Sequence, residues 1–150
     1  MRIKNVVESL CKKYMTRNPY ELASCNNIKI VELSLGGIKG YYSTCYRQKI
    51  IHINSDIPEK DQLRTCAHEL GHGILHPKSN TPFLRANTLF PIGKFEKEAE
   101  HFAVDLLLSD EDMEEYLQYS IPEIASCLCL DPRLVQYRLS VMPKKKYHYI

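Results

Sequence analysis

The sequence predicts an α+β fold in which a small, mostly antiparallel sheet is followed by a long central helix and a helical C-terminal third. Two patterns indicate this class. Apolar residues alternate with polar ones between residues 27 and 54, whereas they recur every three or four residues before and after that region. A chain of 150 residues is long enough to bury a hydrophobic core as one domain, with or without a small appendage.

The first segment predicts two short helices. Apolar side chains follow helical spacing from residue 3 to residue 23, and Asn18 and Pro19 interrupt the pattern. The interruption therefore separates one helix from the next.

The next segment predicts the strands of the sheet. Residues 27–35 alternate in the manner of a strand, and we expect a hairpin after them. The turn conformations would come from three glycines: Gly36, Gly37 and Gly40. Residues 41–45 and 49–54 are rich in aromatic and β-branched side chains, and Arg47 and Gln48 between them form the predicted reversal.

A long helix is predicted to follow the sheet. Ser55 or Asp56 can cap its start, and Pro58 suits its first turn. Pro77 prevents the helix from continuing beyond about His76. This helix contains the most informative motif of the sequence.

The C-terminal half is predicted to be helical after one irregular connection. Residues 77–93 contain three prolines and a glycine with little periodicity. Residues 95–108 form a clear amphipathic helix, and 111–139 predict two or three short helices, broken by Pro122 and Pro132.

These elements suggest how the chain is divided. We expect residues 1–108 to form the main domain and 109–142 a C-terminal helical cap or helix-turn-helix-like segment. Residues 143–150 then form a solvated basic tail.

Composition and charge exclude several classes of protein. The net charge of +2 is too small to indicate a nucleic-acid partner, and no stretch approaches the roughly 18 apolar residues of a membrane span. The first ten residues lack the apolar core of a signal peptide. Six scattered cysteines in a chain of this size are expected to be reduced. We therefore expect a cytoplasmic protein whose oligomeric state the sequence leaves open.

The central helix carries a pattern typical of zinc peptidases. His68 and His72 are four residues apart, so they lie about 40° apart on one helical face and can bind the same ion. The apolar residues cluster on the opposite side of this helix: Leu63, Cys66, Ala67, Leu70 and Ile74. Glu69 lies about 100° from His68, which suits a general base acting on a water at the metal. Two histidines that only pack or cap are the alternative interpretation.

A catalytic zinc ion needs three protein ligands and an open position, so one more ligand must come from elsewhere. On the helix 95–108, the helical wheel puts Glu96 nearest the apolar face, whereas Glu98 and Glu100 lie farther from it. We therefore expect Glu96 to be the most buried of the three and to be the third ligand. His76 is a weaker candidate, because it lies in the last turn beside a proline.

Glu100 follows Glu96 by one helical turn. A carboxylate there could accept the distal N–H of a ligating histidine and fix its tautomer, which makes Glu100 a candidate for the second coordination shell. The alternative for Glu98 and Glu100 is a solvated helix face.

Taken together, these motifs resemble the ImmA/IrrE family of metallopeptidases. The resemblance is carried by Cys66-Ala67-His68-Glu69-Leu70-Gly71-His72, by Glu96-Lys97-Glu98-Ala99-Glu100-His101-Phe102-Ala103 and by Leu106-Leu107-Leu108. Blocks upstream are similar too: residues 18–23, 37–42 and 50–54. The resemblance covers about residues 20–108, and more loosely 121–139.

The resemblance implies a zincin-like minimal metallopeptidase fold that binds one Zn²⁺ ion. It assigns His68, His72 and Glu96 as ligands and Glu69 as the base. Where the family often has Asn or Asp, this chain has Glu100. Members commonly cleave a helix-turn-helix repressor of a phage or mobile element, so a protein substrate of this kind is the expected partner.

Two alternative functions remain open from the sequence. The first is a catalytically silent module that keeps the zincin fold to bind a repressor or antitoxin. The second is a DNA-binding regulator acting through residues 120–139, which could form a helix-turn-helix. Its second helix offers only three side chains suited to DNA: Arg133, Gln136 and Arg138.

Overall fold

The computed structural model describes residues 2–80 and 92–144 and confirms the predicted α+β class. The elements in chain order are α1 (Arg2–Tyr14), α2 (Pro19–Cys25), β1 (Ile28–Leu33), β2 (Gly40–Cys45), β3 (Gln48–Asn54), α3 (Glu59–Leu75), α5 (Ile92–Leu107), α6 (Asp110–Glu114), α7 (Ile121–Leu128) and α8 (Pro132–Ser140). None of the helices within the described residues is long and apolar enough to cross a membrane. All six cysteines are free, as expected.

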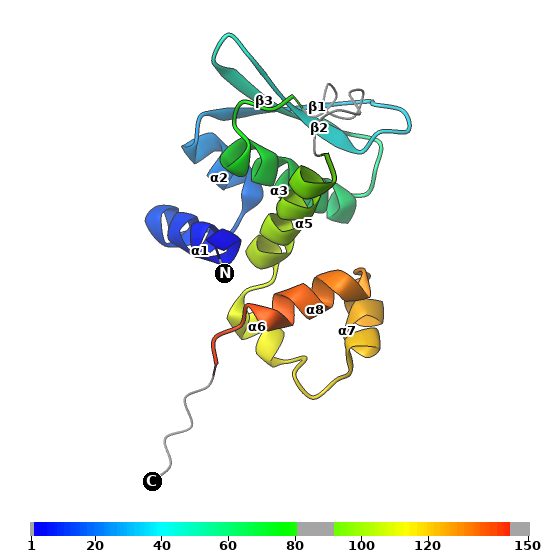
Figure 1. The fold of residues 1–150 in the computed structure, drawn as a ribbon. Helices are drawn as coiled ribbons and strands as arrows, with labels where there is room; N and C mark the ends of the chain where they lie inside the picture. Colours follow the sequence, from blue (N-terminus) through cyan, green and yellow to red (C-terminus); the bar gives the residue numbers. More distant parts are fainter. Residues whose placement is uncertain (1, 81–91, 145–150) are drawn as a thin grey trace.

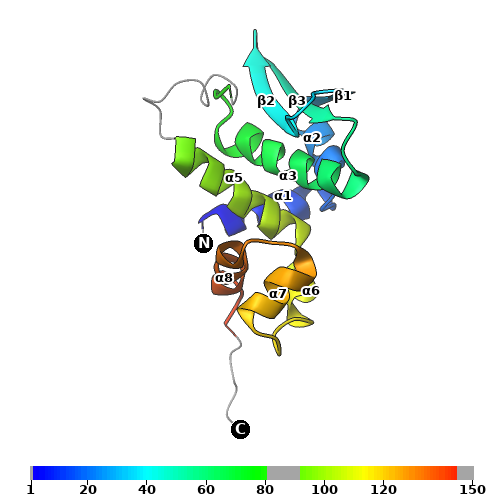
Figure 2. The ribbon, with the colours of Figure 1, turned by 90° about the vertical axis from the view of Figure 1, so that its right-hand side faces the viewer.

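The elements are stacked in successive layers (Figure 1). The sheet covers one side of α3, α5 crosses the other side, and α6, α7 and α8 lie beyond α5, as the view in Figure 2 confirms. Helices α1 and α2 pack alongside, α1 against α5 and α2 against α3 and β1. The main hydrophobic core lies where these layers meet, and its fully buried side chains include Val7, Leu22, Tyr42, Ile51, Leu70 and Phe102. Because α3 is central, its residues are held from both sides.

The two N-terminal helices are confirmed, and the break between them has a local cause. The Asn18 side chain accepts a hydrogen bond from the backbone N–H of Tyr20 at 2.9 Å and so caps α2. Pro19 occupies the first position of that helix, where a missing N–H costs nothing.

The order of the strands differs from the prediction. The sheet has the order β1-β3-β2, so the last strand in sequence is the central one. β1 runs parallel to β3, from the pair Ile28 and Lys49 to the pair Leu33 and Asn54, whereas β2 is antiparallel to β3. The predicted hairpin between the first two strands is therefore wrong, and the sheet is mixed rather than mostly antiparallel.

Asn54, the last residue of β3, explains why the glycine-containing connection does not reverse onto β1. Its side-chain Nδ2 donates hydrogen bonds to the carbonyl oxygens of Gly36 at 3.1 Å and Ile38 at 3.0 Å. Its backbone N–H donates to the carbonyl of Lys39 at 2.8 Å. These bonds hold the connection across the end of β3, so β2, which begins at Gly40, lies on the opposite side of β3 from β1.

The second predicted reversal exists but is shifted by one residue. β2 and β3 form a hairpin whose turn residues are Tyr46 and Arg47, with φ of 49° and 66°. Positive φ at both positions is the geometry that matches the twist of a two-residue hairpin. Gln48, predicted to be in the turn, is already paired with Cys45 in the ladder.

Helix α3 ends where the sequence predicted and begins later. His76 is its C-cap, directly before Pro77. The predicted caps Ser55 and Asp56 are wrong, because the N-cap is Pro58, which makes no side-chain capping bond. Asp56 instead accepts a hydrogen bond from Ser34 at 2.5 Å. Ser34 directly follows β1, so this bond links the end of β1 to the segment before α3.

The predicted apolar side of α3 is buried over most of its length. Cys66, Ala67 and Leu70 are fully buried, whereas Leu63, near the start, is 37% exposed. Gly71 lets α5 approach closely, since a Cβ there would lie 3.2 Å from the backbone of Ala99. This close approach fixes the distance between the two helices that carry the candidate metal ligands.

Gly40 is expected to be intolerant of a side chain. A Cβ at Gly40 would lie 2.5 Å from the carbonyl oxygen of His52 and 2.6 Å from Cγ2 of Thr65. Gly40→Ala should therefore lower the free energy of unfolding by about 1–3 kcal/mol, measured by urea denaturation. Gly37→Ala is the matched control, because nothing lies within 4 Å of a Cβ there. Equal stability of the two variants would contradict this packing.

The C-terminal third is helical as predicted. Helix α5 begins at Ile92 rather than residue 95, and most of the predicted irregular connection, residues 81–91, lies outside the described residues. The three short helices α6, α7 and α8 are separated near the two predicted prolines. A second hydrophobic cluster centred on Ile124, Ala125 and Val135 belongs to these helices.

The domain boundary at residue 108 stays a prediction, and much of the predicted tail at 143–150 lies outside the described residues.

A buried charge network joins the C-terminal helices to α1 and α5. We define it as Lys4, Asp105, Asp110, Tyr137 and Arg138. The Arg138 side chain is fully buried and donates to Asp110 at 2.6 Å, while Lys4 donates to both oxygens of the same carboxylate at 2.9 Å. Tyr137 donates to Asp105 at 2.6 Å, and Arg138 Nε lies 3.7 Å from the other Asp105 oxygen.

The two carboxylates of this network have opposite pKa shifts. Burial raises the pKa of Asp105, although Tyr137 and the charge of Arg138 act in the other direction. Burial also acts to raise the pKa of Asp110, but the bonds from Lys4 and Arg138 outweigh it and the pKa is lowered. Asp110 is therefore the ionised carboxylate that binds Lys4 and Arg138. Ionisation of Asp105, in contrast, is favoured only by Tyr137 and by the neighbouring positive charges.

Candidate metal centre

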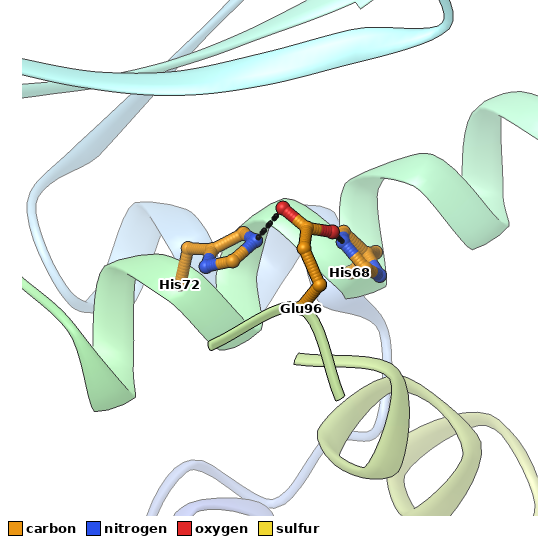
Figure 3. A group of neighbouring side chains, drawn as sticks. All are labelled: His68, His72 and Glu96. Carbon is orange, nitrogen blue, oxygen red and sulfur yellow. Dashed lines mark hydrogen bonds and ion pairs between the residues drawn. The ribbon is translucent and has the colours of Figure 1, made fainter. Parts of the chain in front are cut away.

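Two helices bring three potential metal ligands together. His68 and His72 are one turn apart on α3, and Glu96 is in the second turn of α5. Figure 3 shows the Glu96 carboxylate between the two imidazole rings. One ligand atom from each of the three residues lies within 4.8 Å of the other two. The sequence-predicted trio therefore converges at one place.

The carboxylate makes direct contact with both rings. His68 Nε2 lies 2.8 Å from Glu96 Oε2, and His72 Nε2 lies 3.2 Å from Glu96 Oε1. Burial acts to lower the pKa of His68, but its bond to Glu96 and the nearby carboxylates outweigh this effect and raise that pKa above its ordinary value. Burial acts to raise the pKa of Glu96, but its hydrogen bond with His68 and its close contact with His72 lower that pKa far below its ordinary range. Glu96 is thus ionised over the whole physiological range.

The arrangement fits a divalent cation. His72 is fully buried, yet its Nε2 makes no well-directed hydrogen bond despite its short distance to Glu96. Leaving a buried polar atom without such a bond is costly, and coordination to a metal would satisfy it. Two imidazole nitrogens and one carboxylate are the donor set of many catalytic zinc sites.

Glu69 lies on the wall of a polar cavity next to this trio. The residue is 2% exposed, and it lines a cavity of about 540 Å³ together with His68, Thr65 and Glu100. Residues 37–40, from the connection before β2 and its first residue, also line this cavity. A substrate backbone entering the cavity would meet His68, one of the three candidate ligands, and the Glu69 carboxylate.

The structure reveals a chain of contacts behind His72 that the sequence interpretation missed. His76 Nδ1 lies 3.2 Å from His72 Nδ1, and His76 Nε2 lies 3.5 Å from Glu98. Arg2 in turn donates to Glu98 at 3.0 Å. Because the Nδ1 side of the His72 ring is held by His76, its Nε2 stays directed towards Glu96. The spacing of four residues between His72 and His76 is the sequence feature that indicates this contact, because residues four apart on a helix are neighbours.

Glu98 is also more buried than expected. Its side chain is 15% exposed, against 29% for Glu96, so the prediction that Glu96 is the most buried of the three is wrong. The reason is that Glu98 packs between Arg2 and His76, a neighbourhood that the wheel of a single helix does not contain. Glu100 is exposed, and among the described residues it makes no hydrogen bond to either of the two candidate histidine ligands. Its second-shell role stays a prediction.

Comparison with known proteins points to one family. Residues 23–140 match the model of the IrrE N-terminal-like domain. The chain is 45% identical over 126 residues to uncharacterized immunity region protein 2 of Bacillus phage phi105, an alignment that covers 82% of this chain and 80% of that protein. It is 33% identical over 144 residues to metallopeptidase ImmA of Bacillus subtilis strain 168, covering 92% and 84% respectively.

Proposed function

The chain belongs to the ImmA/IrrE family of metallopeptidases, and from this premise we propose that it is a zinc-dependent endopeptidase. In this proposal His68, His72 and Glu96 hold one Zn²⁺ ion, and Glu69 is the general base. The observation that supports it most directly is the convergence of two imidazoles and one carboxylate beside a polar cavity that Glu69 also lines.

The protein residues divide the chemistry between them. Zinc, when bound, supplies a Lewis acid that polarises a peptide carbonyl and makes water more acidic. The Glu69 carboxylate takes a proton from the attacking water while the oxygen of that water forms a bond to the carbonyl carbon. The same carboxyl group then gives that proton to the leaving amine as the C–N bond breaks. Peptide hydrolysis is thereby balanced without any further reactant.

Removal of the third ligand is expected to release zinc. Glu96→Ala should weaken zinc affinity by more than about 100-fold, because two histidines alone leave the ion under-coordinated. Zinc bound after dialysis against a competing chelator, measured by mass spectrometry, tests this. Glu111→Ala is the matched control, because it removes an exposed glutamate on α6 that is not a candidate ligand. Full zinc occupancy in Glu96→Ala would refute Glu96 as a ligand and direct attention to Glu98 and His76.

We further propose that the substrate is a protein, specifically a helix-turn-helix repressor of a phage or mobile element, which would place the activity in the cytoplasm. The support is the similarity to a phage immunity region protein and to metallopeptidase ImmA. Incubating the zinc-loaded chain with a purified helix-turn-helix repressor of a phage should yield two fragments, visible by intact mass spectrometry. Persistence of the full-length repressor at equimolar enzyme would reject this substrate.

The DNA-binding alternative loses one of its three candidate side chains. Arg138 is fully buried in the charge network and cannot reach a groove. Arg133 and Gln136 remain exposed on α8, which is too small a set for base readout or for a phosphate-binding face. We therefore favour the peptidase.

A further inference from the structure

An apolar cavity lies beside the candidate metal centre, on the side of the C-terminal helices. Its volume is about 200 Å³, and we call it the apolar side pocket. Its walls consist largely of five leucines, which come from the end of α5 and the residue after it, from the end of α7 and the connection after it, and from α8: Leu107, Leu108, Leu128, Leu130 and Leu134. Each of these leucines keeps part of its surface exposed. Apolar surface left open to water in a concave site is what a ligand side chain would cover.

The apolar side pocket adjoins the polar cavity that Glu69 lines. Arg64, His68 and Glu100 line both the pocket and the polar cavity that contains Glu69. His68 is therefore at the boundary between them, with its imidazole beside Glu96 and its flank in the pocket wall. A peptide bond placed at the metal centre would have a neighbouring side chain within reach of the pocket.

Arg64 fixes the wall that the C-terminal helices contribute. It projects from α3, where its Nη2 donates to the carbonyl oxygen of Leu128 at 2.6 Å and its Nη1 to that of Cys129 at 3.3 Å. These carbonyls are at the C-terminal end of α7, where a cation is favoured. The pocket is therefore preformed by a link between the metal-site helix and the C-terminal helices.

We propose that the apolar side pocket is a specificity site of the peptidase, binding a large aliphatic or aromatic side chain of the residue next to the scissile bond. This rests on the proposed function. A cavity of about 150 Å³ with a similar apolar lining accommodates benzene, so the pocket can hold a leucine, methionine or phenylalanine side chain. A charged side chain would lose its hydration there without gaining a partner on the leucine wall.

Binding to the pocket can be tested without proteolysis. The protein with ¹³C-labelled leucine methyl groups is titrated with N-acetyl-leucinamide, N-acetyl-phenylalaninamide and the charged N-acetyl-aspartic acid amide, with zinc and after chelation. The leucine and phenylalanine amides should shift the methyl signals of Leu128, Leu130 and Leu134 at concentrations at least tenfold lower than the aspartic acid amide. Absence of these shifts, or equal shifts with all three, would overturn the proposal.

Leu134→Asp is the variant that tests the pocket itself. Leu134 is partly exposed, and among the described residues it belongs to neither hydrophobic cluster, so its replacement should leave the fold intact. The shifts caused by the apolar amides should disappear in Leu134→Asp and persist in Leu117→Asp, whose leucine is 46% exposed and does not line the pocket. Unchanged binding in Leu134→Asp would contradict the assignment.

Cleavage of a peptide library separates this inference from the proposed function. With tryptic peptides of a bacterial proteome, the zinc-loaded protein should favour leucine, methionine or phenylalanine at one position flanking the cut at least tenfold over aspartate. Leu134→Asp should abolish that preference. Cleavage without an apolar preference would overturn the specificity site and leave the peptidase standing. Binding of the apolar amides with no cleavage of any peptide or protein would overturn the peptidase, and with it this specificity role.

Discussion

Glu69→Gln is expected to reduce peptide hydrolysis by at least about 10²–10⁴-fold while leaving zinc content and stability close to those of the unmodified protein. Glutamine has almost the same shape as glutamate but cannot take a proton from water at neutral pH, so the loss reports the base and not the packing. The residue is 2% exposed and lines the cavity beside the candidate ligands, where its carboxylate can serve this role. Cleavage rates with the repressor substrate, together with zinc content, provide the measurement.

The matched control for this variant is on the same helix. Glu59→Gln makes the same chemical change at an exposed position in the first turn of α3 and should leave hydrolysis unchanged. A Glu69→Gln protein that retains its hydrolytic rate would exclude Glu69 as the base. A protein that binds the repressor with or without this change, and never cleaves it, would instead favour the silent binding module.

Arg138→Met is expected to lower the free energy of unfolding by roughly 3–5 kcal/mol. The change removes the cation shared by Asp105 and Asp110, and Asp105 is fully buried. Without Arg138, the pKa of Asp105, already raised by burial, should rise further, because one of the influences that lower it is gone. Urea or thermal denaturation measures the loss, which for a chain of this length corresponds to a melting temperature lower by roughly 10 °C.

Arg133→Met supplies the comparison. Arg133 is on the same helix with a side chain 91% exposed, so this change should alter stability by less than about 0.5 kcal/mol. If both variants unfold at the same urea concentration, the buried charge network does not hold the C-terminal helices in place.

Local sequence patterns predicted much of the candidate site because the relevant geometry is local. The spacing of His68 and His72 within one helical turn is enough to place both imidazoles on one face. The end of α3 at Pro77 follows from the geometry of proline alone. The position of Glu96 on a single helical wheel predicts a ligand there, and Glu96 does lie beside both histidines, although the prediction that it is the most buried glutamate is wrong.

The features that the sequence did not predict depend on contacts between distant segments. The periodicity of β1 shows which side chains share a face but not which strand is its neighbour, so the parallel pairing with β3 was missed. The burial of Glu98 requires Arg2, 96 residues earlier in the chain. The leucine wall of the apolar side pocket exists only because α7 and α8 fold back towards α3 through Arg64. No window of sequence contains both partners of such a contact.

The central position of β3 has a consequence for the order of folding. β2 and β3 are joined by a two-residue turn, so they can pair within microseconds. β1 precedes both strands but has no neighbour in the sheet until β3 exists, and its pairing requires closure of a longer loop. In pulsed hydrogen-exchange experiments we therefore expect the amides of the hairpin to gain protection before those of β1. The first strand to be synthesised is thus expected to be the last to join the sheet.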